Sequence, residues 1–191
     1  MVKIFLVRHG QDTDNATSIL NGRRDMELTS LGREQAKEVA VKLRDNNIQV
    51  IYASPLKRAY ETARIISGEI GIEEIIVDER LIEREFGLLT GKPLSEIPKY
   101  ADKILPADGV NYFLEVEGAE AFPTLFERGK KILEEISQRH PDENVLIVTH
   151  GDIGKMIRAA FHGWTWEQGL KTPYFSNTGV LELSEKQDVM E

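Results

Sequence analysis

The chain has 191 residues, of which 41% are hydrophobic and 29% charged, so it is long enough to bury a core without disulfides or metals. Its net charge of -8 disfavours a nucleic-acid partner, because proteins that bind nucleic acids are usually basic. It has no cysteine, which excludes thiolate chemistry. We expect a cytoplasmic protein with no membrane partner, because no signal-peptide pattern or long apolar run is present.

Strand and helix patterns alternate along the chain. Apolar runs rich in β-branched residues predict buried strands, and amphipathic patterns between them predict helices. Ser54 and Pro55 are expected to open the second helix as its N-cap and first residue. In chain order we expect a strand at 3–8, a helix at 30–46, a strand at 50–53, a helix from 54 and a strand at 75–77. Further along we expect helices at 120–139 and 152–161 around a strand at 145–149, and a last strand at 179–183.

This alternation predicts an α/β fold of three layers, α/β/α, with a mostly parallel central sheet and an antiparallel last strand. We expect one domain over residues 1–191. The segment 88–118 is rich in proline and glycine, and we interpret it as a short lid inserted over the core.

Two histidines follow predicted strands in the same way. Arg8-His9-Gly10 ends the first strand, and Thr149-His150-Gly151 ends the fourth. Ligand crevices of open α/β sheets lie at this carboxyl edge, so the two imidazoles are expected to share one site. A single histidine of this kind would more often be an inert, hydrogen-bonded residue, but that interpretation is weaker for a matched pair.

An arginine and a carboxylic acid complete the candidate site. Arg58 lies in the first turn of the helix opened at Ser54, where an anion would be attracted. The alternative for Arg58 is a solvated helix face with Glu61 or Glu34 as its partner. Glu83 is a candidate proton donor, with Glu79 and Glu85 as alternatives that spacing does not separate.

These groups suit phosphoryl transfer to nitrogen, in which a neutral imidazole attacks phosphorus and cations stabilise the oxygens. Two histidines and a glutamate could instead bind zinc, but two arginines in the same pocket would repel it. We therefore expect no metal and no cofactor.

The motifs resemble the histidine phosphatase superfamily, in the branch that includes cofactor-dependent phosphoglycerate mutases. The resemblance spans nearly the whole chain. It rests on four motifs in order: Val7-Arg8-His9-Gly10-Gln11 with Asn15, the segment Ser54 to Thr62, the segment Leu81 to Gly87, and Val148-Thr149-His150-Gly151.

The resemblance implies a metal-independent phosphatase, a phosphoric monoester hydrolase of the histidine acid phosphatase type, acting on a small phosphomonoester. His9 would be the phosphorylated nucleophile and Glu83 the proton donor. The implied phosphate-binding residues are Arg8, Asn15, Asn21, Gly22, Arg58, His150 and Gly151, with Arg8, Arg58 and His150 also catalytic. A phosphoglycerate mutase and a catalytically retired phosphate-binding protein are the alternatives. The oligomeric state stays open, with a homodimer as one possibility.

Several departures from the family pattern bear on the substrate. Asp12 stands where the family has Ser or Thr, and would repel a phosphate unless turned away, protonated or paired with Arg23 or Arg24. Asp152 replaces an asparagine of the mutases, and Ile19 an arginine. The lid has no arginine for a second anion, which favours hydrolysis over mutase activity. Its aromatic residues Tyr100, Tyr112 and Phe113 either cover a leaving group or pack the lid.

Overall fold

The computed structural model describes residues 3–183 and 189–190. Its main sheet has six strands in the order β3-β2-β6-β1-β7-β8. Four of them, β1 to β3 and β6, run parallel, and β7 is antiparallel to β1. The strands are β1 Ile4–Arg8, β2 Ile48–Ala53, β3 Ile75–Val77, β6 Asn144–Thr149, β7 Val180–Leu183 and β8 Val189–Met190.

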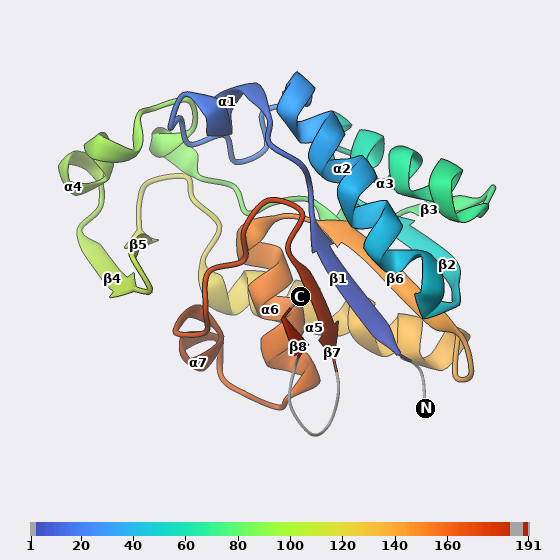
Figure 1. Ribbon diagram of the computed structural model, residues 1–191. Coiled ribbons are helices and arrows are strands. Elements are labelled where there is room, and N and C mark those ends of the chain that lie inside the picture. The colour runs from blue at the N-terminus through green and yellow to red at the C-terminus, as the bar shows by residue number, and fades with distance from the viewer. Residues whose placement is uncertain (1–2, 184–188, 191) are drawn as a thin grey trace.

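Helices cover both faces of this sheet (Figure 1), so the predicted three-layer α/β/α fold is confirmed. One face packs against α2 (Ser30–Leu43) and α3 (Lys57–Ile70), and the other against α5 (Phe122–Arg139) and α6 (Gly151–Phe161). Strand residues alternate between these two apolar layers: Phe5 and Val7 face α2 and α3, whereas Ile4 and Leu6 face α5 and α6. Two-sided burial explains the continuous apolar runs of the strands.

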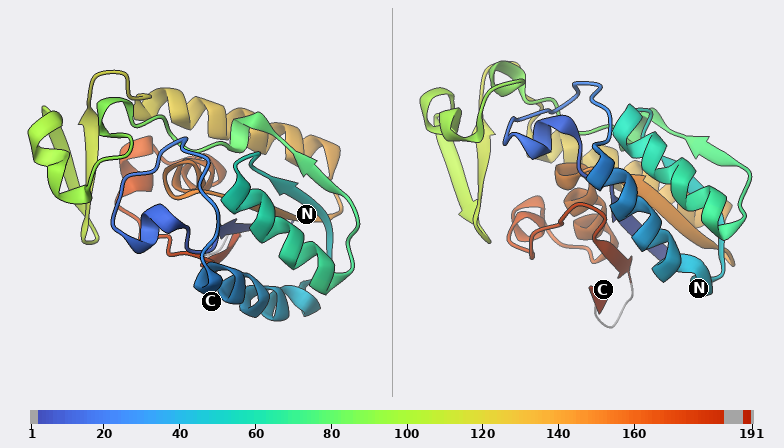
Figure 2. Two further views of the ribbon diagram at one scale, coloured as in Figure 1. Left: turned by 90° about the horizontal axis from the view of Figure 1, so that it is seen from above. Right: turned by 45° about the horizontal axis from the view of Figure 1, so that its top comes forward.

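A second unit lies beyond the carboxyl ends of the strands (Figures 1 and 2). It holds α4 (Ile97–Tyr100) and an antiparallel hairpin of β4 (Lys103–Ala107) and β5 (Val110–Glu115). The sequence predicted only an irregular insertion here, so the hairpin is a finding of the structure. The remaining elements are short: α1 Thr13–Ala16, α7 Trp166–Leu170, and 3-10 turns at Arg44–Asn46, Glu79–Leu81, Gly87–Leu89 and Leu94–Glu96.

Strand register aligns the functional ends of three strands. Arg8 pairs with Thr149 across β1 and β6, and Ala53 pairs with Val148 across β2 and β6. The residues that follow, His9, His150 and Ser54, therefore leave the sheet at neighbouring points of its carboxyl edge.

Two details of the predicted helices are wrong. The second helix begins at Lys57 with Leu56 as its N-cap, so Ser54 is not the cap. Asp25, from a distant loop, accepts the Lys57 backbone N–H at 2.7 Å instead. The amphipathic pattern that predicts the first helix also fails at Leu31, which lies in α2 and is 53% exposed.

Two glycines let the loop after β1 pass directly against the start of α2. A Cβ added at Gly10 would lie 2.4 Å from the Gly32 carbonyl oxygen, and one at Gly32 would lie 2.1 Å from that of Gln11. Both distances are shorter than van der Waals contact, so the backbones approach as closely as glycine permits.

We predict that Gly32→Ala lowers the free energy of unfolding by about 1–3 kcal/mol, the usual cost of overpacking. The matched control is Gly68→Ala, in α3, where an added Cβ meets no atom within 4 Å. That variant should be stabilised by up to about 1 kcal/mol, because alanine favours a helix interior. Urea unfolding of both variants checks this, and equal stability of the two would contradict the close approach.

Candidate active site

His9 stands immediately beyond β1, with only 2% of its surface exposed. Its Nδ1 donates to the Gly10 carbonyl oxygen at 2.7 Å, because a carbonyl can only accept. Its Nε2 therefore carries a lone pair, and accepts from Arg58 Nε at 3.2 Å. Burial, and then the charges of Arg58 and Arg8, hold the pKa of His9 well below its usual value. The imidazole is thus neutral, and Nε2 is its acceptor nitrogen.

His150 lies beside His9, with the two ring centroids 5.0 Å apart. It follows β6, is fully buried, and its Nε2 is 2.7 Å from Ser54 Oγ. Its Nδ1 is buried without a hydrogen-bond partner in the described part of the chain. Burial lowers the pKa of His150 well below its usual value, and Arg58 adds to this effect. The predicted cap role of Ser54 is wrong, and its contact with His150 is not evident from the sequence.

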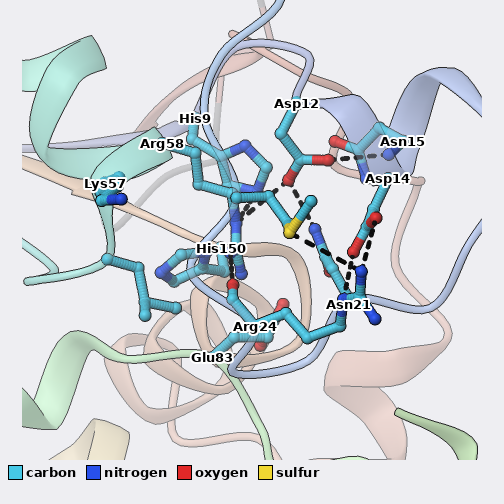
Figure 3. A network of polar contacts seen from close by, with 12 residues as sticks. His9, Asp12, Asp14, Asn15, Asn21, Arg24, Lys57, Arg58, Glu83 and His150 are labelled. Atoms are coloured by element: carbon cyan, nitrogen blue, oxygen red, sulfur yellow. Dashed lines mark hydrogen bonds and ion pairs between the residues drawn. The ribbon is translucent and has the colours of Figure 1, made fainter. Parts of the chain in front are cut away.

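Arg58 is fully buried and bonded at every nitrogen (Figure 3). Its Nη1 and Nη2 donate to the carbonyl oxygens of Arg24 and Gly22 at 2.6 and 2.8 Å. Its Nε lies 3.2 Å from both His9 Nε2 and Asp12 Oδ2. The guanidinium is thereby fixed against the His9 ring, and the solvated partners considered for it, Glu61 and Glu34, are paired with other residues.

Arg8, at the end of β1, supplies a second guanidinium to the candidate site. Its Nη1 donates to the Phe175 carbonyl oxygen at 2.9 Å and to the Tyr174 hydroxyl. Its Nε is buried and, within the residues that the structure describes, has no hydrogen-bond partner. A buried donor of this kind is costly unless a ligand satisfies it, so Nε is a candidate contact for an anion.

Glu83 supplies a buried carboxyl group, with 6% of its surface exposed. It accepts backbone N–H bonds from Arg84 at 2.8 Å and from Asp152 and Ile153 at 3.3 Å. Burial raises its pKa, and the nearby Asp152 carboxylate raises it further. Glu83 can therefore hold a proton at higher pH than an ordinary glutamate.

The two other candidate acids do not reach the cavity. Glu85 accepts the backbone N–H groups of Phe86 and Gly87 and the Thr90 hydroxyl, so it is bound to its own loop. Glu79 is exposed. The structure therefore separates three carboxylates that spacing left equivalent.

Asp12 is fully buried, and it does not form the pair with Arg23 or Arg24 that the sequence left open. One oxygen accepts the Asn15 backbone N–H at 2.7 Å, and the other lies 2.5 Å from Asn21 Nδ2 and 3.2 Å from Arg58 Nε. Burial raises the pKa of Asp12. Figure 3 shows this carboxyl group between Asn21 and Arg58.

Arg23 and Arg24 have other partners. Arg24 Nε lies 2.9 Å from Asp14 Oδ2, and Arg23 Nη2 lies 3.1 Å from Glu120 Oε2. A further residue missed from sequence is Asn177, which donates to the His9 carbonyl oxygen at 2.9 Å and to Asn15 Oδ1 at 3.1 Å. It comes from the loop before β7, and no spacing signal connects that loop to β1.

A cavity of about 230 Å³ opens above these groups. Its lining includes Arg8, Asn15, Asn21, Glu83 and Gly151 together with Tyr112 and Tyr174. His9, Arg58 and His150 are buried and do not themselves contribute to this lining. Gly22, which the resemblance implies as a ligand-binding residue, contributes its carbonyl oxygen to Arg58. No cluster of three or more His, Asp or Glu side chains with metal-site geometry occurs in residues 3–183 or 189–190.

We predict that Asp12→Asn tightens the binding of inorganic phosphate about tenfold at pH 7, or ~1.4 kcal/mol. The variant removes a negative charge beside Arg58, and asparagine caps α1 as well as aspartate does. The difference from the wild type should shrink as pH falls through the raised pKa of Asp12, where the native carboxyl is already neutral. Calorimetric titration measures both effects. Asp45→Asn, on a 3-10 turn, is the charge-matched control, and unchanged affinity in Asp12→Asn would contradict the prediction.

Comparison with known proteins gives a consistent result. The model of the histidine phosphatase superfamily, branch 1, matches residues 4–190. Phosphoserine phosphatase 1 of Hydrogenobacter thermophilus is 31% identical, covering 100% of this chain and 90% of the relative. The 2,3-bisphosphoglycerate-dependent phosphoglycerate mutase of Parvibaculum lavamentivorans is 35% identical, covering 98% and 93%.

A solved structure agrees. Phosphoserine phosphatase of Entamoeba histolytica in complex with 3-phosphoglyceric acid has a TM-score of 0.80 and 26% identity, covering 100% of this chain and 95% of that chain. No helix in the described part of the chain is long and apolar enough to cross a membrane. Because the family model spans nearly the whole chain, this protein belongs to the histidine phosphatase superfamily, branch 1.

Proposed function

We propose that the chain hydrolyses phosphomonoesters without a metal, through a phosphohistidine formed on His9. The observation that carries this proposal is the neutral, buried His9 ring, whose Nε2 lone pair lies 3.2 Å from a buried guanidinium. A nucleophile of this kind needs no general base. The relatives named as phosphoserine phosphatases support the same reaction class.

In the first step, His9 Nε2 attacks phosphorus, and the bond from phosphorus to the alcohol oxygen breaks. Glu83 gives its proton to that oxygen as the alcohol leaves. In the second step, water attacks the phosphohistidine while Glu83 takes a proton from the water. Inorganic phosphate leaves, and His9 and Glu83 return to their starting states.

The positive charges needed for this transfer come from the protein. Arg8 and Arg58 would face the phosphoryl oxygens, and His150 would donate a hydrogen bond to one of them. Such fixed donors stabilise the charge of the transition state without reorganising. Asn15 and Gly151, which line the cavity, would border the bound phosphate.

The mutase alternative is kept, because one relative is named as a phosphoglycerate mutase. A mutase must hold a second anion on the leaving group, and the cavity lining works against this. Ile19 lines the catalytic cavity, and Asp108 and Asp152 add carboxylates nearby. We therefore favour hydrolysis.

We also propose that the enzyme has acid-phosphatase character, which the pH dependence below tests. We further propose that residues 88–118 form a lid within a single domain.

We predict that His9→Ala abolishes phosphate release from p-nitrophenyl phosphate, because the attacking nitrogen is lost. Rapid acid-free denaturation of the wild type during turnover should trap phosphate on His9, in an acid-labile and alkali-stable form detectable by mass spectrometry. A retained rate in His9→Ala would refute the nucleophile. Rapid exchange between 3- and 2-phosphoglycerate with little free phosphate would favour the mutase, and ligand binding without turnover would favour a retired enzyme.

We predict a bell-shaped pH profile for an alkyl phosphate. Activity rises as His9 loses its proton, well below the usual histidine range, and falls as Glu83 loses its proton, above the usual glutamate range. Glu83→Gln should lose the descending limb and about 10²–10⁴-fold of the alkyl phosphate rate.

The loss for p-nitrophenyl phosphate should be far smaller, because nitrophenolate leaves without a proton. Glu79→Gln, an exposed neighbour, is the matched control and should behave as the wild type. Equal losses of Glu83→Gln for both substrates would argue against the acid role.

A further inference from the structure

A second cavity, of about 460 Å³, lies next to the catalytic one and reaches under the β4-β5 hairpin. The two cavities share much of their lining, including Leu20, Phe86, Tyr112, Asp152 and Tyr174. A group bonded to a phosphate beside Arg8 and Glu83 would therefore extend directly into the second cavity.

One wall of this cavity is an ion pair held in an aromatic cage. The Arg84 guanidinium is buried, with its carbon 4.1 Å from the Phe113 ring centroid and 4.2 Å from that of Phe122. Its Nε donates to Asp152 Oδ2 at 2.7 Å. Its Nη2 is buried without a hydrogen-bond partner among the described residues. Asp152 balances the charge of Arg84, so the pair carries no net positive charge, and the rings of Phe113 and Phe122 lie against the guanidinium.

The remaining charges around the cavity are negative or already engaged. Asp108, at the hairpin tip, adds a second carboxylate to the lining. Lys155 lines the catalytic cavity, but its Nζ donates to the Leu170 and Thr172 carbonyl oxygens at 3.2 and 2.7 Å. The second cavity is therefore electronegative, with two carboxylates against one guanidinium.

We infer that this second cavity receives the alcohol part of the substrate, and that Asp152 selects alcohols bearing an ammonium group over those bearing a second anion. The inference rests on the proposed phosphatase function. An ammonium beside Asp152 would gain a charge-assisted hydrogen bond, whereas a carboxylate there would meet like charge at low dielectric. Apolar walls formed by Leu20, Leu94, Ile97 and Phe113 suit the hydrocarbon part of such an amino alcohol.

The test compares two substrates of the same length: O-phosphoethanolamine, with an ammonium, and phosphoglycolate, with a carboxylate. The wild type should have at least tenfold higher kcat/KM for phosphoethanolamine. Asp152→Asn should lower this ratio at least tenfold. Any change in Glu83 or in folding affects both substrates together, so the ratio isolates the selection.

Two further variants keep the test decisive. Asp108→Asn, on the exposed hairpin tip, should lower the ratio in the same direction but less, even if Asp152→Asn folds poorly. Asp102→Asn removes the same charge from an exposed lid position outside both cavities, and should leave the ratio unchanged.

A wild type that prefers phosphoglycolate, hydrolyses neither two-carbon substrate, or keeps its ratio in both cavity variants would overturn the inference. His9-dependent hydrolysis of p-nitrophenyl phosphate would then still support the phosphatase function. If the proposed phosphatase function were wrong, p-nitrophenyl phosphate would also not be hydrolysed, so the two failures can be told apart.

Discussion

The burial of Arg58 beside His9 sets the chemistry of the whole site. A guanidinium without water must be bonded at its donors, and here two carbonyl oxygens, an imidazole and a carboxylate fulfil that need. The same charge acts on both histidines, where it is the first electrostatic cause of their lowered pKa after burial itself. Burial and this fixed cation thus keep His9 neutral, and on the proposed mechanism the same cation would face the phosphoryl group.

The carboxyl groups around the site already pair with most of the nearby arginines and backbone N–H groups. The backbone N–H groups at the start of α6, which would ordinarily attract a bound anion, bond to Glu83 instead. Arg84 forms an ion pair with Asp152, and the Nε of Arg58 forms one with Asp12. Because these groups are already paired, a substrate phosphate would, on the proposed mechanism, depend on Arg8, Arg58 and the two imidazoles.

The sequence predicts those site residues that directly follow a strand. His9 and His150 follow parallel strands in matching register, so their meeting is a consequence of topology. The same reasoning could not find the partner of Asp12, because Asn21 approaches it through loop geometry without a periodic pattern. Asp25 capping α3 and the aromatic cage around Arg84 also join segments far apart in the chain. Such contacts depend on how loops and the hairpin pack, which neither propensity nor spacing encodes.

The gap between Glu83 and Arg8 is bordered by the proposed proton donor on one side and a guanidinium N–H on the other. Both N–H groups of Arg8 Nη1 are engaged, by Phe175 and Tyr174, whereas its Nε is buried and, in the described chain, unbonded. A Cβ at Gly151 would lie 3.7 Å from Glu83 Oε2 and 3.8 Å from Arg8 Nε, so glycine keeps open a gap that faces both. On the proposed mechanism, the leaving oxygen needs the proton of Glu83 while a phosphoryl oxygen on the same phosphorus needs a guanidinium N–H. A gap bordered by these two atoms meets both needs at once.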